Sequence, residues 1–120
     1  MKKVKAIVAL AGALTCGEAL ADGNELLSEC QYAIRYMDTD KMENPSAVGY
    51  CFGTVNGVIS TMASMNKFLL PNERTCFPET IKNSQATRIL VKYLENHPAS
   101  LHRDGPFLAQ AAFQNAYPCR

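Results

Sequence analysis

Five cysteines and two histidines are the first side chains of this chain to consider as nucleophiles or metal ligands. Cys16 lies inside a segment with the features of a secretory signal peptide, which is removed on export. Four cysteines remain in the exported protein: Cys30, Cys51, Cys76 and Cys119. An even number in a short exported domain predicts two disulfides. A cysteine nucleophile assisted by His97 or His102 is therefore not expected, because nucleophilic attack needs a free thiolate.

The spacing of the possible ligands does not fit a metal site. There is no C-x-x-C or H-x-x-x-H pair, which zinc sites commonly use. Asp38, Asp40 and Glu43 gather near a predicted turn, but without the ligand spacing of a calcium loop, so we expect a solvated acidic rim. We also find no glycine-rich phosphate loop and no nucleophile elbow. The sequence thus predicts no enzyme site, no metal and no cofactor.

The beginning of the chain predicts export. A lysine-rich start precedes an apolar stretch over residues 6–14, and Ala19-Leu20-Ala21 offers the small residues that signal peptidase accepts. We predict a signal peptide over residues 1–21, cleaved after Ala21, and a single domain over residues 22–120. The apolar stretch is shorter than the roughly 18 residues that span a bilayer. We therefore expect no membrane segment after cleavage.

The size and charge of the exported domain narrow its functional class. Removing residues 1–21 leaves 99 of the 120 residues, and reduces 12 basic and 11 acidic side chains to 9 and 10. A chain of this length builds a modest core, so disulfides matter for its stability. Nothing in this charge balance resembles the basic footprint of a nucleic-acid-binding protein, so we expect no nucleic-acid partner. The remaining prediction is a binding module.

Apolar residues recur at helical intervals in four segments, which predict an all-α fold. The segments run from Leu26 to Met37 behind Asn24 as N-cap, from Val48 to Met62 behind Ser46, from Pro78 to His97, and from Asp104 to Tyr117. We expect a small disulfide-stapled bundle of about four helices, arranged as two helical hairpins.

The second segment carries conflicting signals. Asn56-Gly57 between β-branched residues is typical of a hairpin, whereas the helical spacing persists for about four turns. We favour a helix, on which Gly49, Gly53 and Gly57 form a glycine stripe. Glycine costs a helix up to about 1 kcal/mol per position, so the stripe predicts a close contact. We favour tight packing within the monomer, and the alternative is the interface of a homodimer.

Helix lengths also predict how the cysteines pair. If the last two helices form an antiparallel hairpin, Cys76 lies about 20 residues before the turn and Cys119 about 16 residues after it. Those positions can approach within the Cα separation that a disulfide requires. We predict a Cys76–Cys119 disulfide, and by elimination Cys30–Cys51.

An ordered set of motifs resembles the Rap/Tai immunity proteins. The motifs are Gly23-Asn24-Glu25-Leu26-Leu27-Ser28-Glu29-Cys30, Gly49-Tyr50-Cys51-Phe52-Gly53 with Gly57, Cys76-Phe77-Pro78, Val91-Lys92-Tyr93-Leu94, His97-Pro98 and Ala116-Tyr117-Pro118-Cys119. The resemblance covers nearly the whole exported chain, but residues 66–75 match no pattern of the family. It implies an all-helical periplasmic immunity protein, often homodimeric, that occludes the cleft of a papain-like peptidoglycan amidase effector of the type VI secretion system.

Two segments are candidates for the part that enters such a cleft, Met65 to Arg74 and Asn96 to Arg103. The candidate contact residues are Phe68, Leu69, Leu70, Arg74, Asn96, His97, His102 and Arg103. Aromatic and arginine side chains often dominate protein interfaces. In the alternative interpretation the leucines belong to the core and His97 simply ends a helix. Alternative functions are a small helical periplasmic chaperone and an orphan binding module.

Overall fold

The computed structural model describes residues 21–119, and they form an all-α fold. Four α-helices are present: α1 (Gly23–Thr39), α2 (Pro45–Met65), α3 (Asn83–Asn96) and α4 (Gly105–Ala116). Short 3-10 turns cover Asn66–Phe68, Pro71–Glu73 and Pro98–Ser100. The predicted fold class is confirmed. Nearly all of the predicted signal peptide lies outside the described residues. None of the described helices is long and apolar enough to cross a membrane.

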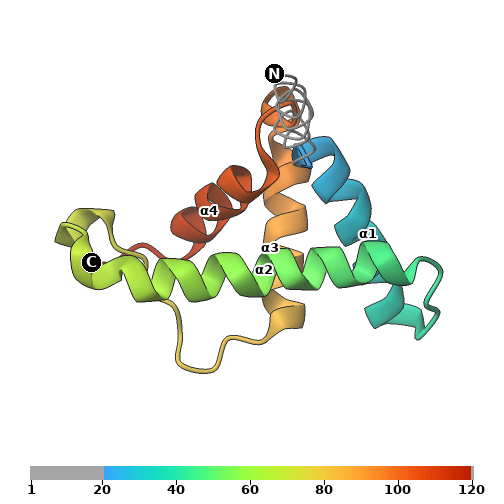
Figure 1. The fold of residues 1–120 in the computed structure, drawn as a ribbon, viewed down its shortest axis with the longest axis horizontal. Coiled ribbons are helices and arrows are strands. Elements are labelled where there is room, and N and C mark those ends of the chain that lie inside the picture. The colour runs from blue at the N-terminus through green and yellow to red at the C-terminus, as the bar shows by residue number, and fades with distance from the viewer. Residues whose placement is uncertain (1–20, 120) are drawn as a thin grey trace, which may run out of the picture.

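Helix α2 is the longest element and lies across α3 (Figure 1). In this view α1 and α4 lie on either side of α3, and every one of the four helices contacts the other three. The core contains the fully buried side chains of Leu26, Val55, Leu90, Leu94 and Phe113. The four helices therefore share one hydrophobic core.

The first two helices begin slightly earlier than the sequence predicted. Asp22, rather than Asn24, caps α1, because its Oδ1 accepts a hydrogen bond from the Glu25 N–H at 3.0 Å. Asn44, rather than Ser46, caps α2 through the Ala47 N–H at 3.1 Å. Proline at the first helical position explains the second shift, since proline needs no hydrogen-bond partner there.

Helix α2 continues without a break through Asn56-Gly57, so the helix prediction is confirmed and the hairpin alternative is wrong. The buried side of α2 includes Val48, Cys51, Val55 and Met62. Burial of these residues at helical spacing outweighs the local preference of Asn-Gly for a turn.

Helix α3 begins at Asn83, so the prediction that it opens at Pro78 is wrong. The Cys76 N–H donates to the Tyr117 carbonyl at 2.8 Å, and Phe77 packs its ring edge against Phe113. These contacts hold residues 76 and 77 against the end of α4. The chain then needs a short turn before α3 can start. Helix α4 begins as predicted, with Asp104 as its cap.

Two disulfides join the helices, in the pairs expected from the helix lengths. Cys30 of α1 bonds to Cys51 of α2, and Cys76 bonds to Cys119. The first disulfide is fully buried in the core. The second joins the segment before α3 to the segment after α4. Each disulfide therefore links the two arms of one helical hairpin.

The glycine stripe does not pack within the monomer, so that prediction is wrong. Added Cβ atoms at Gly49, Gly53 and Gly57 would meet no heavy atom within 4 Å, and all three residues are exposed. The stripe points to solvent because the apolar side of α2 is turned into the core. Gly23, by contrast, has no room for a side chain, because a Cβ there would lie 2.5 Å from Leu108 Cδ1.

The start of α1 is bonded to the connection between α3 and α4. The Gly23 N–H donates to the Arg103 carbonyl at 2.9 Å, and the Gly105 N–H donates to the Ala21 carbonyl at 2.9 Å. Asp22 and Asp104 form an isolated antiparallel bridge between them. The first described residues and the connection between α3 and α4 thus hold each other in place.

Candidate functional site

The connection between α2 and α3 projects beyond the end of α2 (Figure 1) and carries two of the most exposed apolar side chains. We call residues 66–76 the 66–76 loop. Phe68 is 70% exposed and Leu70 is 63% exposed. The alternative in which the leucines belong to the core is therefore wrong for Leu70. Leu69 is half-buried. The loop therefore offers an apolar tip to solvent.

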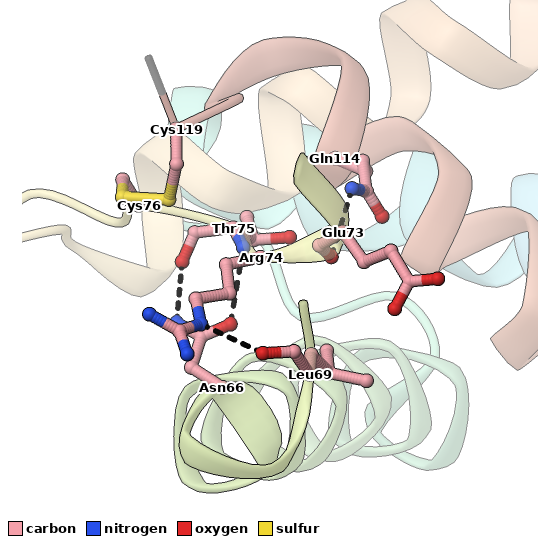
Figure 2. Close-up of a disulfide and its surroundings, with 8 residues drawn as sticks. All are labelled: Asn66, Leu69, Glu73, Arg74, Thr75, Cys76, Gln114 and Cys119. Atoms are coloured by element: carbon pink, nitrogen blue, oxygen red, sulfur yellow. Dashed lines mark hydrogen bonds between the residues drawn. A yellow bond between two sulfur atoms is a disulfide. The ribbon is translucent and has the colours of Figure 1, made fainter. Parts of the chain in front are cut away.

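Hydrogen bonds across the 66–76 loop fix its shape (Figure 2). The Asn66 amide makes two bonds to the backbone of Thr75: Nδ2 donates to its carbonyl at 2.6 Å, and Oδ1 accepts from its N–H at 3.1 Å. Thr75 is buried although it lies in a loop. The two ends of the loop are thus held side by side.

Two further side chains brace the loop tip. Arg74 Nε donates to the Leu69 carbonyl at 3.0 Å, and Glu73 Oε2 accepts from the Leu70 N–H at 3.3 Å. Arg74 is half-buried, and its side chain braces the loop through this bond. From α4, Gln114 Nε2 donates to the Glu73 carbonyl at 3.1 Å. A segment held in this way loses little conformational entropy on binding.

The base of the loop is anchored covalently. The Cys76–Cys119 disulfide joins it to the end of the chain beyond α4, and Thr75 and Pro118 form an isolated antiparallel bridge beside it. Figure 2 shows the disulfide next to Arg74 and Thr75. The chain terminus therefore acts as a support for the loop.

A groove of about 690 Å³ runs beside the loop and is lined by residues of α2, α3, α4 and the loop itself. It brings together Leu69 and His97, one from each of the two predicted segments. Met65 and Phe107, both substantially exposed, also line it. Phe68, Leu70 and Arg74 are not among its lining residues. The groove thus adds apolar surface beside the loop tip.

The second predicted segment begins at the C-terminal end of α3, and its later residues lie near the start of α1 (Figure 1). Asn96, His97, His102 and Arg103 are all exposed there. His97 Nδ1 lies 2.7 Å from the Tyr93 carbonyl oxygen, and its ring stacks on Tyr93. His97 therefore ends α3, as the alternative interpretation expects. Because the carbonyls of Leu101 and Arg103 accept hydrogen bonds from α1, this segment is also a structural joint.

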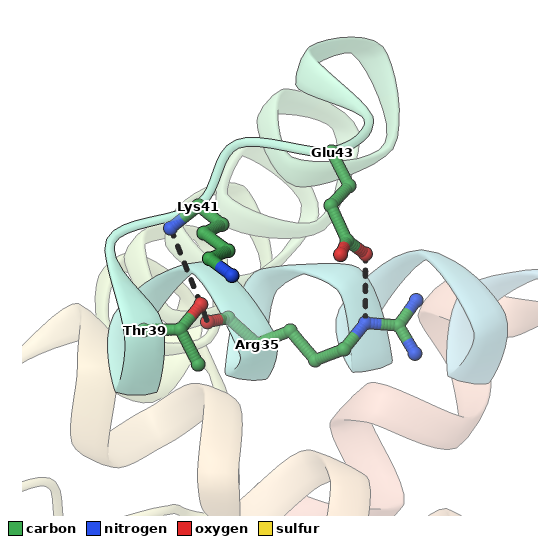
Figure 3. Close-up of polar contacts among 4 residues, drawn as sticks. All are labelled: Arg35, Thr39, Lys41 and Glu43. Atoms are coloured by element: carbon green, nitrogen blue, oxygen red, sulfur yellow. Dashed lines mark hydrogen bonds and ion pairs between the residues drawn. The ribbon is translucent and has the colours of Figure 1, made fainter.

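The acidic residues near the end of α1 are paired with arginines. Glu43 Oε1 lies 3.2 Å from Arg35 Nε (Figure 3), and Asp38 Oδ1 lies 2.6 Å from Arg88. Both pairs are half exposed, so each contributes at most about 1 kcal/mol to stability. Among the described residues no group of three potential ligands could hold a metal ion.

One carboxylate has a perturbed environment. Partial burial of Glu29 in α1, with a smaller contribution from the charge of Glu25, raises the pKa of its carboxyl group above the ordinary value. Glu29 Oε1 is buried and has no hydrogen-bond partner among the described residues.

Comparison with known protein families gives a match over almost the whole described chain. The model of the Rap1a immunity proteins matches residues 22–119. That range contains the four helices, both disulfides and the 66–76 loop. No curated protein matches the chain, and no solved structure matches it. On the match to the family model, the chain belongs to the family of Rap1a immunity proteins.

Proposed function

We propose that this chain is a periplasmic immunity protein that inhibits a type VI secretion peptidoglycan amidase by inserting the 66–76 loop into its active-site cleft. Membership of the immunity family implies inhibition of such an effector and a non-enzymatic role. The effectors concerned are papain-like cysteine amidases, whose clefts a protruding segment can occlude. The family match leaves open which surface makes the contact.

The apolar tip on a braced loop is the observation that carries this proposal. Burying a side chain such as Phe68 or Leu70 contributes roughly 1.5 to 3 kcal/mol. Hydrogen bonds from Asn66, Glu73 and Arg74 hold the tip before any partner arrives. A preformed apolar protrusion suits a narrow cleft, because little ordering opposes binding.

We also propose that α2 carries a homodimer interface. Its 21 residues contain no charged side chain, which is unusual for a helix with a long solvent-exposed side. Gly49, Gly53 and Gly57 leave that side open for close approach of another backbone. A neutral surface of small residues offers no charge for a distinct partner to match, so a second copy of α2 is the better occupant.

Two disulfides support an oxidising compartment, and the predicted signal peptide supports export to the periplasm with cleavage after Ala21. This is also the compartment in which an amidase attacks peptidoglycan. Immunity requires the inhibitor and the effector to meet there.

Periplasmic co-expression with candidate cell-wall amidases tests the proposed function. We expect the chain to prevent lysis by one amidase and to bind it stoichiometrically in calorimetry. The same chain expressed without residues 1–21 should fail to protect, because it stays in the cytoplasm. Absence of both rescue and binding across a broad set of amidases would contradict the proposal and favour the chaperone or orphan alternative.

A further inference from the structure

The two disulfides differ sharply in access to solvent. Cys30 and Cys51 are both 0% exposed, whereas Cys76 is exposed and Cys119 is half-buried. A surface hollow of about 420 Å³ reaches the second disulfide, and its lining includes Arg74 and Pro71. A thiol from solution can therefore approach only one of the two bonds without opening the core.

We propose that Cys76–Cys119 is a thiol–disulfide exchange site through which a dithiol reductant releases the 66–76 loop. A thiolate of the reductant attacks one sulfur, the Cys76–Cys119 bond breaks, and a mixed disulfide forms. The second thiol of the reductant then attacks the reductant's own sulfur in the mixed disulfide and releases the protein cysteine. The reductant leaves as a disulfide after giving two electrons, and two protons convert Cys76 and Cys119 to thiols.

The surroundings of the bond favour this chemistry. Exchange proceeds through thiolates, both as the attacking and as the departing group. Among the described residues, the lining of the hollow includes Arg74 and no carboxylate, so no negative side chain there repels an attacking thiolate. No comparable access exists at Cys30–Cys51, which is enclosed by the core of α1 and α2.

The Cys76–Cys119 disulfide also lies at the base of the 66–76 loop, where breaking it can affect the loop's conformation. Cys76 directly follows Thr75, the residue that both atoms of the Asn66 amide contact. After reduction, only hydrogen bonds such as Cys76 N–H to the Tyr117 carbonyl join the loop to the end of the chain. The regulatory consequence rests on the proposed function, because it requires that the loop bind an amidase.

Differential alkylation tests the site in the full chain, exported and purified in its oxidised form. The protein is incubated with increasing dithiothreitol and trapped with light N-ethylmaleimide. After denaturation and complete reduction, heavy reagent labels the remaining cysteines. We expect Cys76 and Cys119 to acquire the light label at least tenfold faster than Cys30 and Cys51. Equal rates, or faster opening of the buried pair, would overturn the proposal.

Hydrogen exchange gives a second readout. Mild reduction should speed exchange in residues 66–76 while the amides of α1 and α2 stay protected. A C76S/C119S double variant should match the reduced protein in this respect, and the R88Q variant, which changes an exposed arginine on α3, should not. Unchanged exchange in the loop of the reduced protein would exclude control by this bond.

Calorimetry with the cognate amidase separates this inference from the proposed function. A loss of affinity of tenfold or more on mild reduction is expected. Equal affinity before and after reduction would leave the proposed function intact and overturn the regulation. If the oxidised protein bound no amidase, the proposed function would fail, and the order of alkylation would still decide whether the exchange site exists.

Discussion

Asn66 and Thr75 are joined by two hydrogen bonds that use both polar atoms of one side-chain amide. Nδ2 donates to the Thr75 carbonyl at 2.6 Å, and Oδ1 accepts from the Thr75 N–H at 3.1 Å. The short asparagine amide supplies a donor and an acceptor on two separate atoms. Both of these hydrogen bonds therefore depend on one side chain.

Replacing Asn66 with aspartate keeps the shape but removes the donor and turns an oxygen toward the Thr75 carbonyl. We expect N66D to lower the free energy of unfolding by about 1 to 3 kcal/mol, the usual cost of an unsatisfied buried polar group. Urea denaturation measures the loss, and hydrogen exchange locates it. N72D, an exposed change in the same loop, is the control, and equal stability of the two variants would refute the role of Asn66.

Truncating the loop tip should weaken effector binding without affecting the fold. F68A and L70A should each reduce affinity for the cognate amidase at least tenfold, or about 1.4 kcal/mol. The free energy of unfolding should change by less than about 0.5 kcal/mol, because both side chains are exposed. M42A, which removes a comparably apolar exposed side chain between α1 and α2, should bind normally. Wild-type affinity in both loop variants would exclude the tip as the contact.

The glycines of the fold should respond to alanine in opposite directions. G53A should raise the free energy of unfolding by up to about 1 kcal/mol, since alanine favours helix and its Cβ meets nothing within 4 Å. G23A should lower it by about 1 to 3 kcal/mol, because the new Cβ would lie 2.8 Å from the Leu101 carbonyl oxygen. Urea denaturation of dilute protein measures both, and the same sign for the two changes would contradict the packing described.

A charge placed on the glycine stripe should prevent dimerisation. We expect the wild-type chain to sediment as a dimer and G57E as a folded monomer, because the exposed position accepts a side chain but a dimer interface would bury its charge. Q31E on the exposed side of α1 is the matched control. A wild-type chain that stays monomeric at high concentration would rule out the interface.

Glu29 should make stability depend on pH. The pKa of its carboxyl is raised in the folded state, so the folded protein binds this proton more readily than the unfolded chain. This contribution favours the folded state as pH falls through the window between the raised and the ordinary pKa, and it is lost as pH rises through it. We expect E29Q to be a few tenths of a kcal/mol more stable than wild type at neutral pH. The difference should vanish in acid, and E95Q on the exposed side of α3 should show no such trend.

The sequence was sufficient where periodicity and helix length decide the structure. The cysteine pairs could be predicted because Cys76 and Cys119 lie at similar distances before and after the connection between the last two helices. This places both cysteines at the same end of a hairpin. Helix α2 could be predicted through Asn56-Gly57 because its apolar spacing extends well beyond those two residues.

The details that depend on a distant partner could not be predicted. Periodicity indicates which side of α2 is apolar, but it does not say whether another helix covers Gly49 and Gly53. Likewise, the bond from Arg74 to the Leu69 carbonyl has no sequence signature, because every residue carries a carbonyl. The late start of α3 after Pro78 follows from contacts with residues of α4, which lie far away in the chain.

The hydrogen bonds that join residues 21–23 to residues 103–105 require most of the chain to be present before α1 completes its contacts. If the chain is exported, as we propose, those contacts form only after residue 105 has crossed the membrane. Ala21 is only 6% exposed once its carbonyl accepts the Gly105 N–H. If signal peptidase cuts after Ala21, it must act before that bond forms, and processing then precedes folding.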